Sequence, residues 1–151
     1  VMYSDDNGFH IRIAHEVKSD PATAYSQFLK VGEWWNAEHT WFGDSKNLSI
    51  DPVADGCFCE IKGDQSAKHM TVSYVDPGKE VRMTGGLGPL SGLGLHGAMN
   101  WMFEPLDNGG TRIIHNYRVT GFYPEGLKGL ADIVDQVQTL QVSGLLTRLM
   151  K

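Results

Sequence analysis

The sequence predicts an α+β fold in which a curved antiparallel sheet of about seven strands wraps around one long C-terminal helix. Three observations predict it. Residues 9–18 form a strand pattern that leads directly into a short helical segment, and a run of short strands separated by turns follows. Residues 125–150 then form a single helical pattern without proline. The apolar face of that helix has to be buried, and a curved sheet is the only partner in the chain large enough to cover it.

Length and charge limit the classes of function. The chain has 151 residues, which suits a single domain spanning residues 1–151. Its net charge is -5 and it contains no basic run, so nucleic acid is a poor candidate partner, because binding phosphates requires clustered Lys and Arg. No apolar stretch approaches the ~20 residues that span a bilayer. We expect a soluble protein with no membrane span.

The N-terminal part predicts one strand and two short helices. Residues 1–8 are polar, and we expect them to be flexible. Residues 9–18 alternate between apolar and polar, as in a half-buried strand. Asp20-Pro21 reads as a helix N-cap followed by proline at the first helical position. Trp34-Trp35 then falls in a second short helix or turn.

Six further strands follow, separated by strong turn signals such as Asp55-Gly56 and Asn108-Gly109-Gly110. Short turns between sequential strands indicate an antiparallel meander. The predicted strands are 47–51, 57–63, 69–75, 80–85, 95–104 and 111–122. In the final helix the broad apolar face comprises Leu127, Leu130, Val134, Val137 and Leu140.

The more apolar side of each strand predicts which residues face inward, and a mostly apolar interior with a few polar groups is typical of a ligand cavity. The same pattern also describes many ordinary cores. Phe58 is as apolar as Cys57 and Cys59, so the inward side of that strand stays open. The predicted inward set is Ile13, His15, Val17, Cys57, Cys59, Ile61, Val81, Met83, Met99, Trp101, Phe103, Ile113, His115, Tyr117 and Val119.

His15 and His115 each interrupt an apolar stripe. If the first and last strands are neighbours, the two side chains could bind a polar ligand group or act as acid and base. The alternative is that both are hydrogen-bonded histidines of an ordinary core, and we favour it because the inward side of a strand is hard to assign from sequence alone.

We expect no metal site and no cofactor. The six histidines show no HxxxH or HExxH spacing. Cys57 and Cys59 are separated by a single residue. A disulfide between such close neighbours would be strained, so we expect two inert thiols.

Two further segments are candidates for the wall of a pocket. An aromatic cluster follows the first helix and comprises Trp34, Trp35, His39 and Trp41. It either lines the mouth of a pocket or packs as a hydrophobic plug between the small helices and the sheet. Both interpretations are true if one Trp ring fills the core and the other lines the cavity. Residues 85–97 are rich in glycine but lack the Lys-Ser/Thr ending of a phosphate loop. We interpret them as a long hairpin loop, which at a pocket rim would act as a lid.

Several short motifs together resemble the START-like (SRPBCC) superfamily, and within it the polyketide cyclase/dehydrase-like proteins and the relatives of the activator of heat-shock-protein-90 ATPase. The resemblance spans the chain from about residue 9 to the final helix. Its motifs are Asp20-Pro21, Trp34-Trp35 with His39-Thr40, the runs 47–51 (NLSID) and 56–60 (GCFCE), GGLGPL at 85–90, and Trp101 in a strand ending at Glu104-Pro105.

The resemblance implies the helix-grip fold, whose members hold lipids, polyketides, hormones or other apolar molecules in a cavity. Some of them catalyse cyclisation or dehydration, and others are binding proteins or co-chaperone domains. Proteins that resemble this one are often exported in bacteria, and the start at Val1 suits the mature part of an exported protein, although the sequence leaves the compartment open.

Three functions follow, in decreasing order of support. The first is binding of a small apolar or amphipathic molecule, with His15 and His115 orienting its polar end. The second is a cyclase- or dehydratase-type enzyme in which His15 or His115 transfers protons. The third is a protein-interaction domain with a filled core. The other expected ligand contacts are Trp35, Met99, Trp101, Phe103 and Tyr117.

Overall fold

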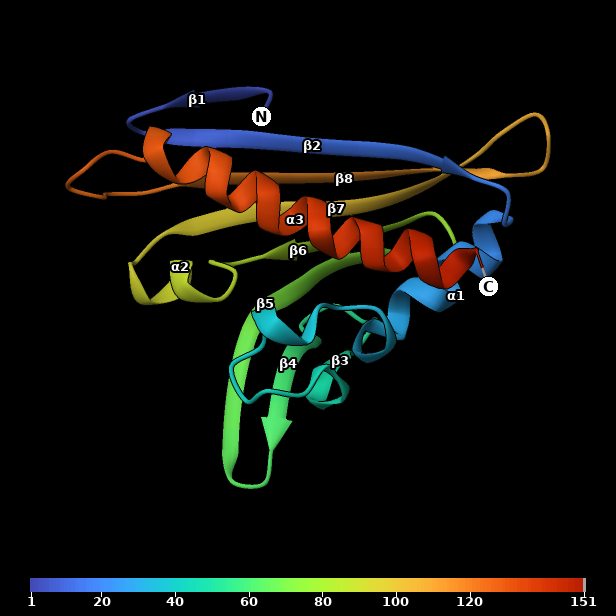
Figure 1. Cartoon of the computed structure of the whole chain (residues 1–151), viewed down its shortest axis with the longest axis horizontal. Helices are drawn as coiled ribbons and strands as arrows, with labels where there is room; N and C mark the ends of the chain where they lie inside the picture. The colour runs from blue at the N-terminus through green and yellow to red at the C-terminus, as the bar shows by residue number, and fades with distance from the viewer. Residues whose placement is uncertain (151) are drawn as a thin grey trace.

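A computed structural model describes residues 1–150 and shows one antiparallel sheet of eight strands in the order β1-β2-β8-β7-β6-β5-β4-β3. A long helix, α3, runs across one face of this sheet, and the β4-β5 hairpin projects away from it (Figure 1). The predicted α+β class and the antiparallel sheet with a long C-terminal helix across it are therefore confirmed, although the sheet has eight strands rather than about seven.

The seven predicted strands are all present. The strands are β1 (Tyr3–Asp5), β2 (Gly8–Val17), β3 (Leu48–Ile50), β4 (Cys57–Lys62), β5 (Gln65–Asp76), β6 (Glu80–Thr84), β7 (His96–Pro105) and β8 (Thr111–Thr120). The α-helices are α1 (Pro21–Leu29), α2 (Pro89–Gly92) and α3 (Lys128–Leu149). Three single-turn 3-10 segments, η1 (Val31–Glu33), η2 (Ala37–His39) and η3 (Ser45–Asn47), follow α1 where one second short helix was expected.

The additional strand is β1, which lies in the N-terminal segment expected to be flexible. The Asp5 carboxylate accepts hydrogen bonds from the backbone N–H groups of Asn7 and Gly8 at 2.7 and 3.1 Å, which closes a tight turn. β1 thereby pairs with β2, and the amino group of Val1 contacts Asp135 on α3. Because Asp5 pairs with Gly8, the turn residues are Asp6 and Asn7, and the polar composition of this segment conceals the hairpin.

The short helix α1 begins where the sequence predicts. Asp20 is the N-cap, and its side chain accepts a hydrogen bond from the Thr23 N–H at 2.8 Å. Pro21 occupies the first helical turn. Ala24 and Phe28 bury the apolar side of the helix against the sheet.

Helix α3 buries its predicted apolar side at its N-cap residue, Leu127, but its inner face also includes two glutamines and excludes Leu140. Gln138 and Gln141 point inward and are fully buried, whereas Leu140 is 50% exposed. The inward stripe continues through Val142 and Leu145. Two glutamines can lie inside because each finds hydrogen-bond partners there.

The inward side of β4 is also the reverse of the predicted one. Phe58 and Glu60 point into the core, while Ile61 is 55% exposed. Cys57 and Cys59 lie on the opposite side and are joined by a disulfide, so the expectation of two thiols is wrong. Sequence alone cannot reveal this reversal, because a buried Glu is a rare occupant of a core position.

Gly144 is the point of closest approach between α3 and the segment that follows α1. A Cβ atom at Gly144 would lie 2.1 Å from the carbonyl oxygen of Trp34. Gly129, near the start of the same helix, has open space at the corresponding position.

We therefore predict that Gly144→Ala lowers the free energy of unfolding by roughly 2–3 kcal/mol, because the backbone of Trp34 has to move. Gly129→Ala is the matched control and should raise it by roughly 0.5 kcal/mol, as expected for replacing a helical glycine in open space. Urea unfolding of both variants checks this, and equal effects of the two substitutions would contradict the close packing.

Candidate ligand-binding site

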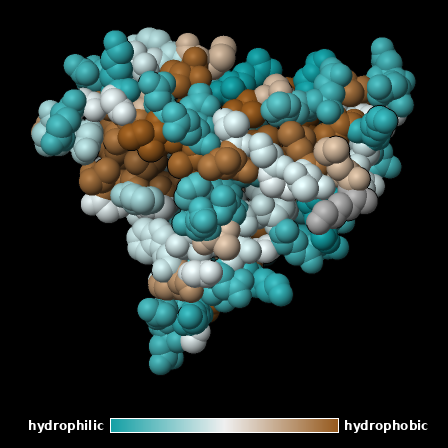
Figure 2. Space-filling view, viewed as in Figure 1, coloured by the Kyte–Doolittle hydropathy of each residue, from teal (hydrophilic) through white to brown (hydrophobic). Residues whose placement is uncertain are grey.

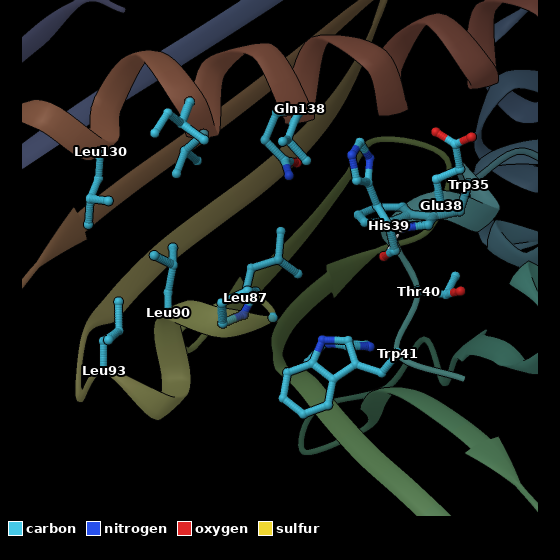
Figure 3. Close-up of a pocket in the computed structure, with 16 residues that line it drawn as sticks. Trp35, Glu38, His39, Thr40, Trp41, Leu87, Leu90, Leu93, Leu130 and Gln138 are labelled. Atoms are coloured by element: carbon cyan, nitrogen blue, oxygen red, sulfur yellow. Dashed lines mark hydrogen bonds between the residues drawn. The ribbon is translucent and has the colours of Figure 1, made fainter. Parts of the chain in front are cut away.

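A cavity of about 400 Å³ lies between α3, the loop around α2 and the segment that follows α1. The loop contributes Leu87, Leu90 and Leu93, and α3 faces them with Leu130, Ile133, Val134 and Val137 (Figure 3). Apolar side chains also gather on the surface between α2 and α3 (Figure 2), where Leu93 and Ile133 are exposed. The cavity is therefore apolar and opens to solvent through an apolar rim.

The glycine-rich segment forms one wall of this cavity. It joins the antiparallel neighbours β6 and β7, as expected for a hairpin loop, and it also contains the short helix α2. Gly86 lies so close to the neighbouring backbone that a Cβ atom there would be 2.6 Å from the Leu95 carbonyl oxygen. Tyr117 anchors the segment: its hydroxyl accepts the Leu87 N–H at 2.9 Å and donates to the Gly85 carbonyl oxygen at 3.2 Å. Burial raises the pKa of Tyr117 to about 12, so this anchor stays protonated.

Of the paired tryptophans, Trp34 fills the core and Trp35 lines the cavity. Trp34 is buried and donates its indole N–H to the Phe28 carbonyl oxygen at 3.0 Å. Its ring packs on Trp101 and Phe28, so it plugs the core. Trp35 lines the cavity and donates to the His39 carbonyl oxygen at 3.3 Å. His39 and Trp41 also line the cavity.

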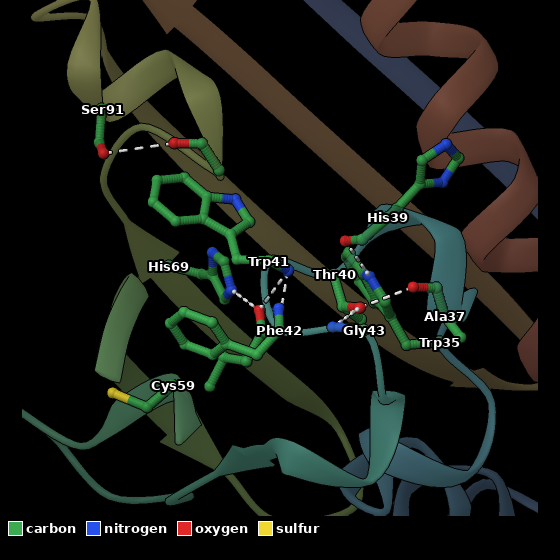
Figure 4. A network of polar contacts seen from close by, with 12 residues as sticks. Trp35, Ala37, His39, Thr40, Trp41, Phe42, Gly43, Cys59, His69 and Ser91 are labelled. Carbon is green, nitrogen blue, oxygen red and sulfur yellow. Dashed lines mark hydrogen bonds and ion pairs between the residues drawn. The ribbon is translucent and has the colours of Figure 1, made fainter. Parts of the chain in front are cut away.

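The buried carboxylate of Glu60 supports the wall of the cavity near Trp41. Figure 4 shows the polar contacts around Trp41, Phe42 and His69. Glu60 is 0% exposed, and its oxygens accept hydrogen bonds from the backbone N–H groups of Trp41 and Phe42, the shortest at 2.9 and 2.7 Å. His69 Nε2 lies 2.9 Å from Glu60 Oε1. Burial alone would raise the pKa of Glu60, but the hydrogen bonds from Trp41, His69 and Phe42 together lower it, so the carboxyl is ionised.

The second histidine of the cavity is His39, and a glutamine fixes its hydrogen bonding. Gln141 Oε1 accepts the backbone N–H of Asn36 at 2.8 Å. The amide nitrogen of Gln141 therefore faces His39 Nδ1, at 2.9 Å, and Nδ1 acts as the acceptor. The neutral His39 ring then carries its proton on Nε2.

His115 lies behind the cavity wall. It is 0% exposed and stacks on Trp101 with ring centroids 3.9 Å apart. Its Nδ1 lies 3.2 Å from the Asn100 carbonyl oxygen, and its Nε2 lies 3.0 Å from the side-chain amide of Gln138. Burial lowers the pKa of His115 to about 4, although both hydrogen bonds partly oppose this. The ring is therefore neutral at physiological pH.

The seven predicted site residues fall into three groups: one lines the cavity, five are buried in the core and one is exposed. Trp35 lines the cavity, whereas Met99, Trp101, Phe103, Tyr117 and His115 are buried in the core and are not among the lining residues. His15 is exposed near the end of β2.

The expectation that the first and last predicted strands are neighbours is confirmed, because β2 pairs with β8. His15 lies opposite Ile113 and His115 opposite Ile13, so the two histidines occupy diagonal positions. The structure does not bring them together at the cavity, because one is exposed and the other is enclosed by Trp101 and Gln138.

Sequence reasoning missed His69 and Glu60. The register between β4 and β5 shifts at this point, since Phe58 pairs with Met70 and Cys59 with Lys68. The intervening His69 is an extra residue, and both His69 and Met70 are buried. A β-bulge of this kind re-aims a side chain and breaks the alternation on which sequence reasoning depends. The only available signal was an acidic residue, Glu60, within an apolar strand.

Within residues 1–150, no cluster of three or more metal-ligating side chains occurs. In the same range, no helix combines the length and the apolar character needed to cross a bilayer.

A curved antiparallel sheet with a long C-terminal helix across it defines the helix-grip fold. The cavity lies beside this helix, and His69 of β5 is the sheet residue among its lining residues. Solved structures share this fold. An uncharacterised protein from Rhizobium leguminosarum superposes with a TM-score of 0.69 at 14% identity over 95% of both chains.

Two further solved structures with a similar fold are those of DynU16 and Ara h 8.0201. DynU16, a protein of the dynemicin biosynthetic locus, has a TM-score of 0.65 at 12% identity over 94% of this chain and 47% of its own. Ara h 8.0201 has a TM-score of 0.59 at 11% identity over 95% of this chain and 98% of its own. No family model and no curated protein sequence matches the chain.

The buried His115 predicts a specific acid sensitivity. An unfolded chain takes up a proton at His115 below its ordinary pKa of 6.5, whereas the folded protein takes it up only near pH 4. The free energy of unfolding should therefore fall as the pH drops through this window, by up to about 3 kcal/mol from this residue.

His115→Gln removes this contribution, so its unfolding free energy should vary less with pH than that of the wild type between about pH 7 and pH 4. Urea unfolding at several pH values measures the difference. Parallel pH profiles for the two proteins would contradict a neutral, enclosed His115.

Proposed function

We propose that this chain is a START-like domain that binds a small, mostly apolar molecule in the cavity between α3, the α2 loop and the segment containing Trp35 and Trp41. The observation that carries the proposal is the cavity itself: about 400 Å³, lined mainly by leucine, valine and tryptophan side chains, and open at an apolar rim. Small-molecule sites in proteins typically have volumes of ~300–1,000 Å³ and this kind of lining.

The apolar lining also explains why α3 carries valines and leucines on a side that the sheet does not cover. Leu130, Val134 and Val137 face the cavity and are only partly buried. Covering such surface gains ~25 cal/mol per Å². An apolar ligand would recover this free energy, less the cost of ordering the ligand.

The other two candidate functions receive less support. A protein-interaction domain with a filled core would have no cavity of this size. A cyclase- or dehydratase-type enzyme that relies on His15 or His115 lacks both groups at the cavity, since His15 is exposed and His115 is enclosed in the core.

We predict that the neutral fluorescent probe N-phenyl-1-naphthylamine binds with micromolar affinity, because its naphthyl and phenyl groups are small enough for the cavity. Val137→Trp should weaken this binding about tenfold or more, a change of ~1.4 kcal/mol, because the larger ring occupies ligand space.

Leu140→Trp is the matched control, since Leu140 lies on the same helix but is 50% exposed and outside the cavity lining. It should leave the affinity within about twofold. Absence of any saturable probe fluorescence, or equal loss in both variants, would refute binding in this cavity.

A further inference from the structure

We propose that His69, held by Glu60, is a hydrogen-bond acceptor of the cavity and that it selects an apolar ligand with a hydroxyl donor, such as a phenol or an enol. This inference rests on the proposed function and adds the class of ligand. It depends on three features: the ionised state of Glu60, the free nitrogen of His69, and the position of His69 in the wall.

The first feature fixes the tautomer of His69. Glu60 is a carboxylate whose oxygens already accept two backbone N–H groups, from Trp41 and Phe42. A carboxylate only accepts hydrogen bonds, so the proton shared at 2.9 Å between Glu60 Oε1 and His69 Nε2 belongs to the imidazole. The neutral ring then has no proton on Nδ1, which is left as an acceptor.

The second feature is that Nδ1 has no partner within residues 1–150. The only side-chain nitrogen or oxygen there that is fully buried without a hydrogen bond is Asn100 Oδ1. His69 Nδ1 makes no hydrogen bond in the same range, so it has to retain some accessible surface. His69 lines the cavity and is otherwise 7% exposed.

The third feature is the fixed position of His69 in the wall. The β-bulge between β4 and β5 turns His69 inward, and the rings of Trp41 and Phe58 pack edge-on against it with centroids 6.0 and 5.6 Å away. An unfilled acceptor in an apolar wall favours a ligand that supplies a donor, because burying the nitrogen without one costs free energy. A hydroxyl on an aromatic or enolic frame supplies that donor and an apolar body together.

The test compares three naphthalene probes of similar size in competition with N-phenyl-1-naphthylamine: 2-naphthol, a donor; 2-methoxynaphthalene, which lacks the donor; and 2-acetylnaphthalene, a stronger acceptor. The pH is mildly alkaline but leaves 2-naphthol protonated. Wild type should bind 2-naphthol roughly five- to tenfold more tightly than 2-methoxynaphthalene. The ratio of affinities is the measure, so a general loss of cavity affinity cancels.

His69→Phe keeps a ring but removes the acceptor, so the two affinities should become equal within about twofold. Glu60→Gln tests the positioning role of Glu60. Its carbonyl oxygen would accept the backbone N–H groups of Trp41 and Phe42, and its amide NH₂ would donate to His69 Nε2. The imidazole proton then moves to Nδ1, and the variant should prefer 2-acetylnaphthalene over 2-naphthol.

Equal binding of 2-naphthol and 2-methoxynaphthalene to wild type would overturn the inference while the proposed function stands. So would an unchanged preference in His69→Phe, or a Glu60→Gln variant with all affinities reduced by one common factor. If no probe, including N-phenyl-1-naphthylamine, binds the folded wild-type protein, the proposed function and this inference fail together.

Discussion

One buried negative charge, the carboxylate of Glu60, constrains the part of the molecule that surrounds the cavity. It is completely enclosed and has no basic side chain other than His69 among its hydrogen-bond partners. A charge in such a position would be very costly without compensation. Backbone N–H groups from Trp41 and Phe42, together with His69, supply that compensation, so the segment after α1 is tied to strands β4 and β5. The same carboxylate therefore positions Trp41 at the cavity rim and fixes the proton of His69.

The cavity exists because α3 is packed tightly at one end and covered loosely at the other. Near its C-terminal end, Gly144 contacts the backbone of Trp34, and Leu145 is fully buried. Towards its N-terminal end, Leu130 and Val134 face the α2 loop across open space. Tyr117 holds that loop in place from the sheet through Leu87 and Gly85. The space between the loop and the helix is consequently a stable feature of the fold.

The sequence predicted the fold well because alternation, turn residues and the helix N-cap are local signals. All seven expected strands and the Asp20 cap appear where expected, and β1 was missed because its Asp6-Asn7 turn lies in a polar segment. The site was predicted poorly because it depends on non-local features. A β-bulge turned His69 inward, and buried glutamines replaced Leu140 on the inner face of α3. Trp35 lines the cavity, and its aromatic cluster is visible in the sequence, but the sequence does not show which of the paired tryptophans plugs the core.

The central claim, that the cavity receives a small apolar molecule, can be tested residue by residue with methyl NMR spectroscopy. Leu and Val methyl groups would be labelled and the protein titrated with 2-naphthol. The account predicts saturable shift changes at Leu87, Leu90, Val134 and Val137, which line the cavity, and none at Val53 or Leu106, which do not. Shift changes that leave the cavity methyl groups untouched, or no changes at all, would contradict it.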